Sequence, residues 1–373
     1  MISFVWSASH PFLAGAGGSE NFTAGQIREL QRRGIKARII TLGFGAKDSR
    51  DQFPDIEFKA LRSKEQLSLL NDTIVYVTYP LNVHTKHPVY TILHCPPASC
   101  GVTDPLFNKR AAKRKNMNLI AASRFSATMW EHDLGLGRGS ISVDYPFADE
   151  AFGAAQRPKH RGHKRRILFS GRLHPDKGIY TLLATMHVLK KARQPFEMTV
   201  TTAGARSDDG EVVKALMDAH PWIRVVPAGR NPQEVAKIMA SHDIVVMPST
   251  NLFWKELFGM VSIEAQHAGC RVVASNAGGL PETDCGGLML VEPDNPQSLA
   301  EGLIKAAKRG PLSDVERRRA SSVFTVEESV EVLLDIIGKG ATAVKPLRLP
   351  KLATSHRPAT APLLRPDYLS ETT

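Results

Sequence analysis

The stretch Lys-Glu-Leu-Phe-Gly-Met-Val-Ser-Ile-Glu-Ala-Gln-His-Ala-Gly, residues 255–269, lies between Asp-Ile-Val-Val-Met-Pro-Ser at 243–249 and Arg-Val-Val-Ala-Ser at 271–275. The two flanking segments are short β-branched runs, a pattern typical of buried strands. Between them, Met260–Ala268 has helical spacing, and Gly269 is a common helix stop. The order strand, helix, strand predicts two parallel neighbours in one sheet, with the helix packed on a face of that sheet.

The same alternation extends outward from this unit through most of the chain. Glu20–Arg33 is a predicted helix, and Gly34 ends it. Further predicted strands are Ile2–Ser7, Ala37–Leu42, Thr73–Thr78, Val89–His94 and Asn118–Ser123 in the first half, and Arg166–Gly171, Glu197–Gly204 and Trp222–Val226 in the second. This pattern predicts an α/β protein with two doubly wound parallel sheets that carry helices on both faces.

The alternation pauses at the basic run Arg-Pro-Lys-His-Arg-Gly-His-Lys-Arg-Arg, residues 157–166. We therefore predict a first domain at 1–152, a linker at 153–165 and a second domain at 166–325. A last amphipathic helix, Val326–Ile337, lies within a C-terminal segment at 326–340. Residues 341–373 are rich in Pro, Thr and basic side chains, so we expect a disordered basic tail.

Composition limits the classes of function. Of 373 residues, 42% are hydrophobic and 23% charged, which are ordinary globular values. The formal net charge of +11 favours polyanionic partners, namely phosphate esters, nucleic acid or an anionic membrane. No aromatic residues interleave the basic ones in the manner of single-strand binding, so we expect no nucleic acid. The absence of a long apolar run and the four cysteines predict a cytoplasmic protein, with peripheral contact at the inner face of a membrane as an option.

Ligands of open α/β sheets bind beyond the carboxyl ends of the strands, which directs attention to four loops. In Gly-Ala-Gly-Gly-Ser-Glu, residues 15–20, Gly17 and Gly18 would let the backbone approach an anion at a helix N-terminus. The alternative is a loop that merely needs positive φ. In Ser-Gly-Arg-Leu-His-Pro-Asp-Lys-Gly, residues 170–178, Arg172 and Lys177 combine a planar fork with a point charge, as a diphosphate requires. The alternative is two ordinary solvated cations.

The third loop contains Glu256 and leads into the helix that contains Glu264. Free backbone N–H groups at the N-terminus of that helix would point between the two carboxylates, each of which can accept hydrogen bonds from neighbouring sugar hydroxyls. These N–H groups belong to Gly259, Met260 and Val261. An acidic residue that merely favours the helix dipole would explain Glu256 but not Glu264, whose apolar neighbours suggest burial.

In the fourth loop, His94 ends a predicted strand just before Cys95-Pro-Pro, at a cleft position. A lone His is more often structural than catalytic, and this alternative stays open. Cys95 and Cys100 beside it could be metal ligands, but no second Cys or His pair follows at the required spacing. We therefore expect no metal site.

At this point the sequence resembles the retaining GT-B glycosyltransferases of glycosyltransferase family 4. Glu256 to Glu264 matches the E-x7-E signature of that family, and the loop at 171–178 is similar to its phosphate loop. The similarity is strongest from Arg166 to Pro296 and weaker over the first 150 residues. It implies two Rossmann-like domains that face a cleft, the first on the acceptor side and the second binding a nucleotide sugar. The helix at 326–340 is expected to cross back onto the first domain.

The resemblance also implies a role for each candidate residue. Arg172 and Lys177 would hold the donor diphosphate, Glu264 the ribose hydroxyls and Glu256 the donor sugar. Gly259, Met260 and Val261 would offer backbone N–H groups, Gly17 and Gly18 would approach the diphosphate, and His94 would lie near the sugar. Catalytic roles fall to His94, Glu256, Arg172 and Lys177.

The implied reaction moves a hexosyl or N-acetylhexosaminyl group from a UDP-, GDP- or ADP-sugar, with retention and without a metal or cofactor. The nucleotide sugar itself is the substrate, and the acceptor would be a glycan, a lipid-linked or a phosphorylated molecule. A sugar-nucleotide epimerase or phosphorylase, or a non-catalytic sugar-nucleotide-binding subunit, is the alternative on the same fold.

Some features depart from the family or stay unassigned. Leu257 replaces a proline of the family pattern, and Tyr-Pro-Phe-Ala-Asp at 145–149 replaces Asn-Gly-Val-Asp. The basic clusters at 108–115 and 157–166 suit an anionic membrane or a phosphorylated acceptor, but we favour a solvated face.

Overall fold

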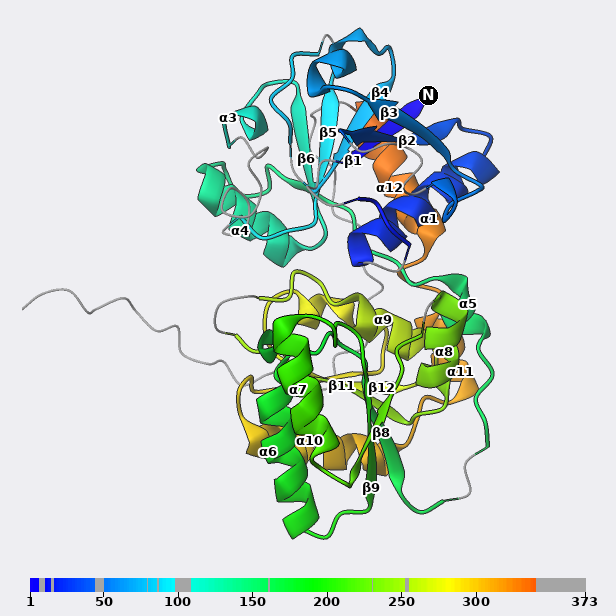
Figure 1. Ribbon diagram of the computed structural model, residues 1–373, viewed down its shortest axis with the longest axis vertical. Coiled ribbons are helices and arrows are strands. Elements are labelled where there is room, and N and C mark those ends of the chain that lie inside the picture. Colours follow the sequence, from blue (N-terminus) through cyan, green and yellow to red (C-terminus); the bar gives the residue numbers. More distant parts are fainter. Residues whose placement is uncertain are drawn as a thin grey trace, which may run out of the picture.

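Two lobes stacked end to end make up the protein, as the computed structural model in Figure 1 shows. It describes residues 1–6, 11–14, 17–43, 50–78, 80–85, 87–97, 109–159, 162–229, 231–251 and 255–339. The predicted tail at 341–373, Cys100 and the first residue of the 108–115 cluster lie outside this set.

A seven-stranded parallel sheet forms the first lobe, in the order β3-β2-β1-β4-β5-β6-β7. Its strands are β1 Ile2–Trp6, β2 Ala37–Leu42, β3 Glu57–Leu61, β4 Thr73–Val77, β5 Val89–Leu93, β6 Met117–Ala121 and β7 Ser142–Val143. Its helices are α1 Gly18–Arg32, η1 Lys64–Leu69, α3 Lys109–Ala112 and α4 Arg124–Leu134. The strand order reverses next to β1, which opens a crevice at the carboxyl ends of the strands.

A six-stranded parallel sheet forms the second lobe, in the order β10-β9-β8-β11-β12-β13. Its strands are β8 Arg165–Phe169, β9 Phe196–Thr201, β10 Ile223–Val226, β11 Ile244–Met247, β12 Arg271–Ser275 and β13 Leu288–Val291. Its helices are α5 Glu150–Ala154, η2 Pro175–Lys177, α6 Ile179–Lys191, α7 Asp208–Asp218, α8 Pro232–Ala240, α9 Met260–His267, η3 Leu280–Thr283, α10 Pro296–Arg309 and α11 Asp314–Ala320. The predicted α/β class with two doubly wound parallel sheets is confirmed.

The last helix, α12 Val326–Lys339, returns from the second lobe to the first. Figure 1 shows it in orange beside α1, and the buried side chains of Val330, Leu333 and Ile336 join Leu30 in the core under the first sheet. A buried polar link supports this packing, because the Gln26 side chain on α1 donates to the Ser329 hydroxyl at 2.9 Å. The chain thus crosses between the lobes twice, once before α5 and once before α12.

Three strands that the sequence analysis missed all lie at sheet edges, namely β3, β7 and β13. β3 has exposed residues at Glu57 and Ala60, β7 is two residues long, and β13 exposes Leu290. β3 and β7 are only partly covered and lack the continuous apolar run that identifies a central strand. β13 is an apolar run of four residues that the sequence analysis overlooked. The central strands Ala37–Leu42 and Arg271–Ser275, by contrast, have the predicted bounds.

Candidate functional site

A large cavity, of about 1450 Å³, lies between the lobes and receives the loops that follow the strands of both sheets. Every candidate residue from the sequence lines it. Those from the first lobe are Gly17, Gly18 and His94, and those from the second are Arg172, Lys177, Glu256, Gly259, Met260, Val261 and Glu264. The four charged residues Arg172, Lys177, Glu256 and Glu264 therefore line the same cavity. The sequence analysis predicted this arrangement for a site that binds a sugar diphosphate.

The cation loop, residues 170–178, follows β8 and is held tightly at both ends. Leu173 is 1% exposed and anchors the loop in the core of the second lobe. Gly178 has φ +74°, and a Cβ there would lie 1.7 Å from the carbonyl oxygen of Pro248, so only glycine fits. This anchoring leaves Arg172 exposed, and among the described residues it has no ion-pair partner. Its guanidinium is available to a ligand.

Lys177, on the same loop, pairs with the carboxylate of Glu256, and both side chains are largely shielded from solvent. The pair joins the loop after β8 to the loop after β11. A shielded ion pair next to an open cavity can exchange partners, because an incoming phosphate or hydroxyl replaces the contact that is lost.

Backbone geometry around Glu256 is fixed by glycines. Gly259 has φ +107° and forms the N-cap of α9, so the free N–H groups of the first turn of α9 face the cavity. Gly279 donates its N–H to the carbonyl of Glu256 at 2.8 Å, and a Cβ on Gly278 would lie 2.2 Å from that oxygen. The turn at 278–279 therefore fits directly under the loop that carries Glu256.

Glu264 lies inside α9, half-buried, and no hydrogen bond to its carboxylate is found within the described part of the chain. Burial, with the charge of Asp149 as a smaller contribution, raises the pKa of Glu264 to about 7. A buried carboxylate without hydrogen-bond partners raises the free energy of the folded, ligand-free protein. Ligand hydroxyls can supply the missing donors.

A smaller cavity of about 120 Å³ adjoins the main one behind Glu264. The hydroxyl of Thr201, which lines it, is buried and has no partner among the described residues. This recess, whose lining is mostly apolar, extends the cavity beside Glu264 into the second lobe.

His94 follows β5 and lines the cavity from the first lobe. Its Nε2 is buried without a partner among the described residues, and its ring packs edge-on against Phe22 with centroids 5.3 Å apart. Burial lowers the pKa of His94 to about 4, so the ring is neutral at physiological pH. His94 can therefore exchange a hydrogen bond with a ligand but adds no positive charge.

The glycine loop brings the lobes into close approach. Gly17 is extended, with φ −169°, and Gly18 is not among the glycines with positive φ, so positive φ does not explain either residue. Gly15 lies outside the described residues. A Cβ on Gly18 would lie 2.9 Å from the sulfur of Met260 in the opposite lobe. Gly18 therefore gives the lobes room to approach, whereas a Cβ on Gly17 would meet only Ser19 and Glu20 of its own lobe.

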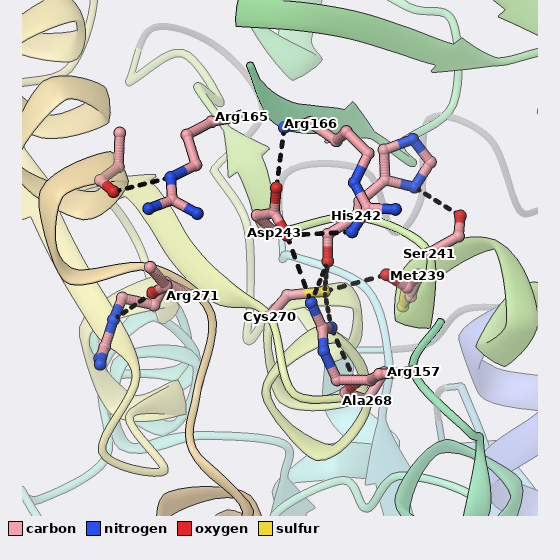
Figure 2. A network of polar contacts seen from close by, with 12 residues as sticks. Arg157, Arg165, Arg166, Met239, Ser241, His242, Asp243, Ala268, Cys270 and Arg271 are labelled. Carbon is pink, nitrogen blue, oxygen red and sulfur yellow. Dashed lines mark hydrogen bonds and ion pairs between the residues drawn. The ribbon is translucent and has the colours of Figure 1, made fainter. Parts of the chain in front are cut away.

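Much of the basic run at 157–166 is structural, contrary to the solvated face that we favoured from the sequence. Figure 2 shows Arg157 and Arg166 converging on Asp243, with Nη2–Oδ1 distances of 3.6 and 3.1 Å. Arg157 also donates to the carbonyl of His242 at 2.7 Å, and Arg165 to that of Ala307 at 3.0 Å. Among the described residues of this run, Lys159, His163 and Lys164 are exposed, so the solvated interpretation is retained for them.

Among the described residues, no three His, Cys, Asp or Glu side chains are grouped so that they could hold a metal ion. Cys95 is disulfide-bonded, so the cytoplasmic location predicted from the four cysteines gains no support from it. None of the described helices combines the length and apolarity that a membrane crossing requires.

Sequence reasoning missed the residues that join the lobes. Ser123, Glu282 and Tyr145 contact across the lobes, and Asp149 influences the charge of Glu264. Tyr145 and Asp149 attracted notice only as departures from a family pattern. A local motif does not signal an interdomain contact, which depends on how two finished domains dock.

Comparisons with known proteins agree with this geometry. Residues 164–309 match the family model described as glycosyl transferases group 1. A lipopolysaccharide 1,2-N-acetylglucosaminetransferase from Salmonella typhimurium is 29% identical over 168 residues, 43% of each chain. A D-inositol 3-phosphate glycosyltransferase from Arthrobacter is 36% identical over 150 residues, 38% of this chain and 35% of that one. The matched region thus spans less than half the length of these relatives.

The whole fold is similar to solved structures. A glycosyltransferase from Rickettsia africae superposes with a TM-score of 0.70 and 16% identity, covering 91% of this chain and 98% of that one. The Anabaena protein HepE, in complex with UDP and glucose, gives 0.65 and 17%, covering 90% and 99%. The two Rossmann-like domains therefore have the GT-B architecture that the sequence predicted.

Proposed function

We propose that this protein is a glycosyltransferase that moves a sugar from a nucleoside diphosphate sugar to an acceptor, with retention of anomeric configuration and without a metal. The single observation that carries the proposal is the convergence of Arg172, Lys177, Glu256 and Glu264 on one interlobe cavity. Two cations can bind a diphosphate, and two carboxylates can accept hydrogen bonds from sugar hydroxyls. The similarity of the second domain to group 1 glycosyl transferases supports the same conclusion.

The proposed donor pose follows from the spacing of the charges. The diphosphate lies against Arg172, Lys177 and the N-terminus of α9, where N–H groups and the helix dipole favour negative charge. Glu264 accepts hydrogen bonds from the ribose hydroxyls. Glu256 exchanges part of its contact with Lys177 for hydroxyls of a hexosyl or N-acetylhexosaminyl group.

In the transfer step, the bond between the anomeric carbon and the diphosphate oxygen breaks. Its electron pair leaves with the nucleoside diphosphate, whose growing charge Arg172, Lys177 and the α9 N-terminus stabilise. The acceptor oxygen bonds to the anomeric carbon on the face that the leaving group vacates, and its proton passes to the departing phosphate. Cationic groups fixed beforehand contribute most to such a charge separation.

His94 and the glycine loop complete the proposed site from the first lobe. The neutral ring of His94 offers a hydrogen bond near the donor sugar, and Gly17 and Gly18 let the backbone approach the diphosphate. Closure would exclude water, which would otherwise hydrolyse the donor. We also propose that the protein is cytoplasmic and contacts a membrane peripherally.

A two-stage assay tests this function. A thermal-shift panel of UDP, GDP, ADP and their glucose and N-acetylglucosamine derivatives identifies the donor, since a ligand of the native state raises the melting temperature. We then expect nucleoside diphosphate release that depends on an added acceptor. Glu256→Ala should abolish release, whereas Glu301→Ala, at an exposed site on α10, should not. Release without incorporation into any acceptor, or binding with no turnover, would instead support an epimerase, a phosphorylase or a sensor subunit.

A further inference from the structure

The loop that carries Glu256 is held from the opposite lobe, a contact that the proposed donor pose does not use. Ser123, the N-cap of α4 in the first lobe, donates its hydroxyl hydrogen to the carbonyl oxygen of Leu257. Leu257 directly follows Glu256. The same Ser123 oxygen accepts a hydrogen bond from the N–H of Ser126 at 3.0 Å. One hydroxyl therefore caps α4 and also bonds to the loop that carries Glu256.

Glu282, on η3 of the second lobe, caps the same helix across the domain boundary. Its two carboxylate oxygens accept from the backbone N–H groups of Arg124 and Phe125, at 2.9 and 2.8 Å. These N–H groups belong to the first turn of α4 and have no partner within the helix. A carboxylate is well suited to this end of the helix, because it meets both the free donors and the positive end of the dipole.

Tyr145 joins this contact from the first crossing between the lobes. Its hydroxyl donates to Glu282 at 2.9 Å. Its ring packs against Phe258 and Phe324, with ring centroids 5.7 Å away in each case. Phe258 lies two residues after Glu256, and Phe324 lies just before α12 on the second crossing. Burial and the neighbouring Glu282 charge raise the pKa of Tyr145, so its hydroxyl stays a donor at physiological pH.

A rigid connection links Glu282 back to Glu256. The turn at 278–279 leads into η3, and Gly279 donates to the carbonyl of Glu256. A Cβ at Gly279 would lie 2.1 Å from the carbonyl oxygen of Leu257, so the turn and the loop are in direct contact. Any movement of η3 relative to the second sheet must therefore displace the backbone that carries Glu256.

We propose that Glu282 and Tyr145 are positioning residues, which set the location of Glu256 only when the lobes are closed. In the closed form, α4 and the crossing segment hold η3 through Glu282, and the turn at 278–279 transmits this position to Glu256. When the lobes separate, the first turn of α4 loses the Glu282 carboxylate and the loop loses its support from Ser123. Closure and alignment of the sugar-facing carboxylate are thus one event.

This inference rests on the proposed function, and the experiment separates the two. Glu282→Ala, Glu282→Gln, Tyr145→Phe and the control Glu292→Ala, at an exposed site on the same domain, are compared in the full chain. For each, kcat, the KM for the donor, the affinity for the nucleoside diphosphate alone and the radius of gyration by X-ray scattering are measured.

We expect Glu282→Ala to lower kcat about 30-fold, because a small misplacement of a group that contacts the sugar costs that much. Affinity for the nucleoside diphosphate should stay within about threefold, because Arg172 and Lys177 belong wholly to the second lobe. The radius of gyration should rise. Glu282→Gln keeps one acceptor oxygen but turns an amide NH2 toward a backbone N–H, so it should lower kcat several-fold, as should Tyr145→Phe. Glu292→Ala should match the wild type.

A Glu282→Ala variant with the kcat and radius of gyration of the wild type would overturn the inference. If that variant does not fold, Glu282→Gln and Tyr145→Phe carry the test, and unchanged kcat in both would overturn it equally. If the wild type itself transfers no sugar, the proposed function fails. The scattering comparison then still decides whether Glu282 holds the lobes together.

Discussion

The two ends of the second sheet use the same kinds of charged residue for opposite purposes. At the amino ends of β8 and β11, Arg157 and Arg166 converge on Asp243, with Arg165 bonded to a carbonyl nearby (Figure 2). At the carboxyl ends of the same strands, Arg172 is exposed. Lys177 pairs with Glu256, and both residues line the open cavity.

The difference lies in how far the charges satisfy one another. At the amino ends, burial opposes ionisation of Asp243, but hydrogen bonds from Arg166 and the attraction of two guanidinium groups outweigh it, and the pKa of Asp243 lies below its ordinary value. At the carboxyl ends, burial prevails and raises the pKa of Glu264. Internal satisfaction stabilises a fold, whereas incomplete satisfaction beside a cavity provides for a ligand.

The largest effect is expected from removing both cations at the carboxyl ends. Arg172→Ala with Lys177→Ala should reduce kcat/KM for the donor by about a thousandfold, since two charge-assisted hydrogen bonds to the diphosphate are lost together. Steady-state kinetics measure the effect. Lys214→Ala, which removes an exposed lysine of α7 in the same domain, is the matched control and should change nothing. A double variant with near-normal kcat/KM would show that the cations at the carboxyl ends of the strands do not bind the donor, so the two ends of the sheet would not differ in function.

Next in size is the removal of Asp243, which should damage stability and leave binding intact. Asp243→Ala leaves two shielded guanidinium groups without their carboxylate, at a cost of about 3 kcal/mol and roughly 10 °C in melting temperature. Thermal unfolding gives the first quantity and calorimetric titration of the nucleoside diphosphate the second. Asp218→Ala, which breaks an exposed pair with Lys214, should cost under about 1 kcal/mol. Weaker nucleotide binding by folded Asp243→Ala would mean that the two ends are not independent.

A pH effect at Glu264 is expected to be smaller. Because burial raises the folded pKa to about 7, the empty protein should lose stability as pH rises from the unfolded pKa of about 4.5 through 7. Glu264→Gln should remove this loss. Ribose hydroxyls donate to the ionised form and lower the pKa on binding.

Donor affinity should therefore increase about tenfold as pH rises through 7, with proton release at that pH. Titration calorimetry in two buffers of different ionisation enthalpy counts the protons. Equal proton release by the wild type and Glu264→Gln would show that another group is responsible.

The smallest effect is expected from Arg165, which lies at the amino end of β8. Arg165→Ala removes one hydrogen bond to the carbonyl of Ala307 and should cost about 1 kcal/mol of stability. Donor and acceptor KM should stay at wild-type values, as initial-rate measurements can establish. A raised acceptor KM would instead assign the basic run to a phosphorylated acceptor.

What the sequence could predict follows from the range of the interactions involved. Central strands such as Val89–Leu93 are buried on both faces and are visible as apolar runs, whereas the edge strand at 57–61 is not. The site residues could be predicted from the sequence for a similar reason. Topology places every loop after a strand at one edge of the sheet, so Arg172 and Glu256 had to meet once both were assigned to such loops.

The rest depended on three-dimensional packing. Arg157 appears in the sequence as one of many basic residues, and only the docking of the linker under β11 shows that Asp243 neutralises it. Glu282 and Tyr145 are 137 residues apart and meet only because the two lobes close. A contact across separately folded domains leaves no periodic or local pattern for sequence reasoning to use.

The central claim is that Arg172 and Lys177, the two cations after β8, bind the diphosphate of a sugar nucleotide. Calorimetric titration of a nucleoside diphosphate and the matching monophosphate, into the wild type and into Lys177→Ala, tests it most directly. The account predicts that the wild type prefers the diphosphate by at least about tenfold, and that Lys177→Ala loses most of that preference. An undiminished preference in Lys177→Ala would contradict it.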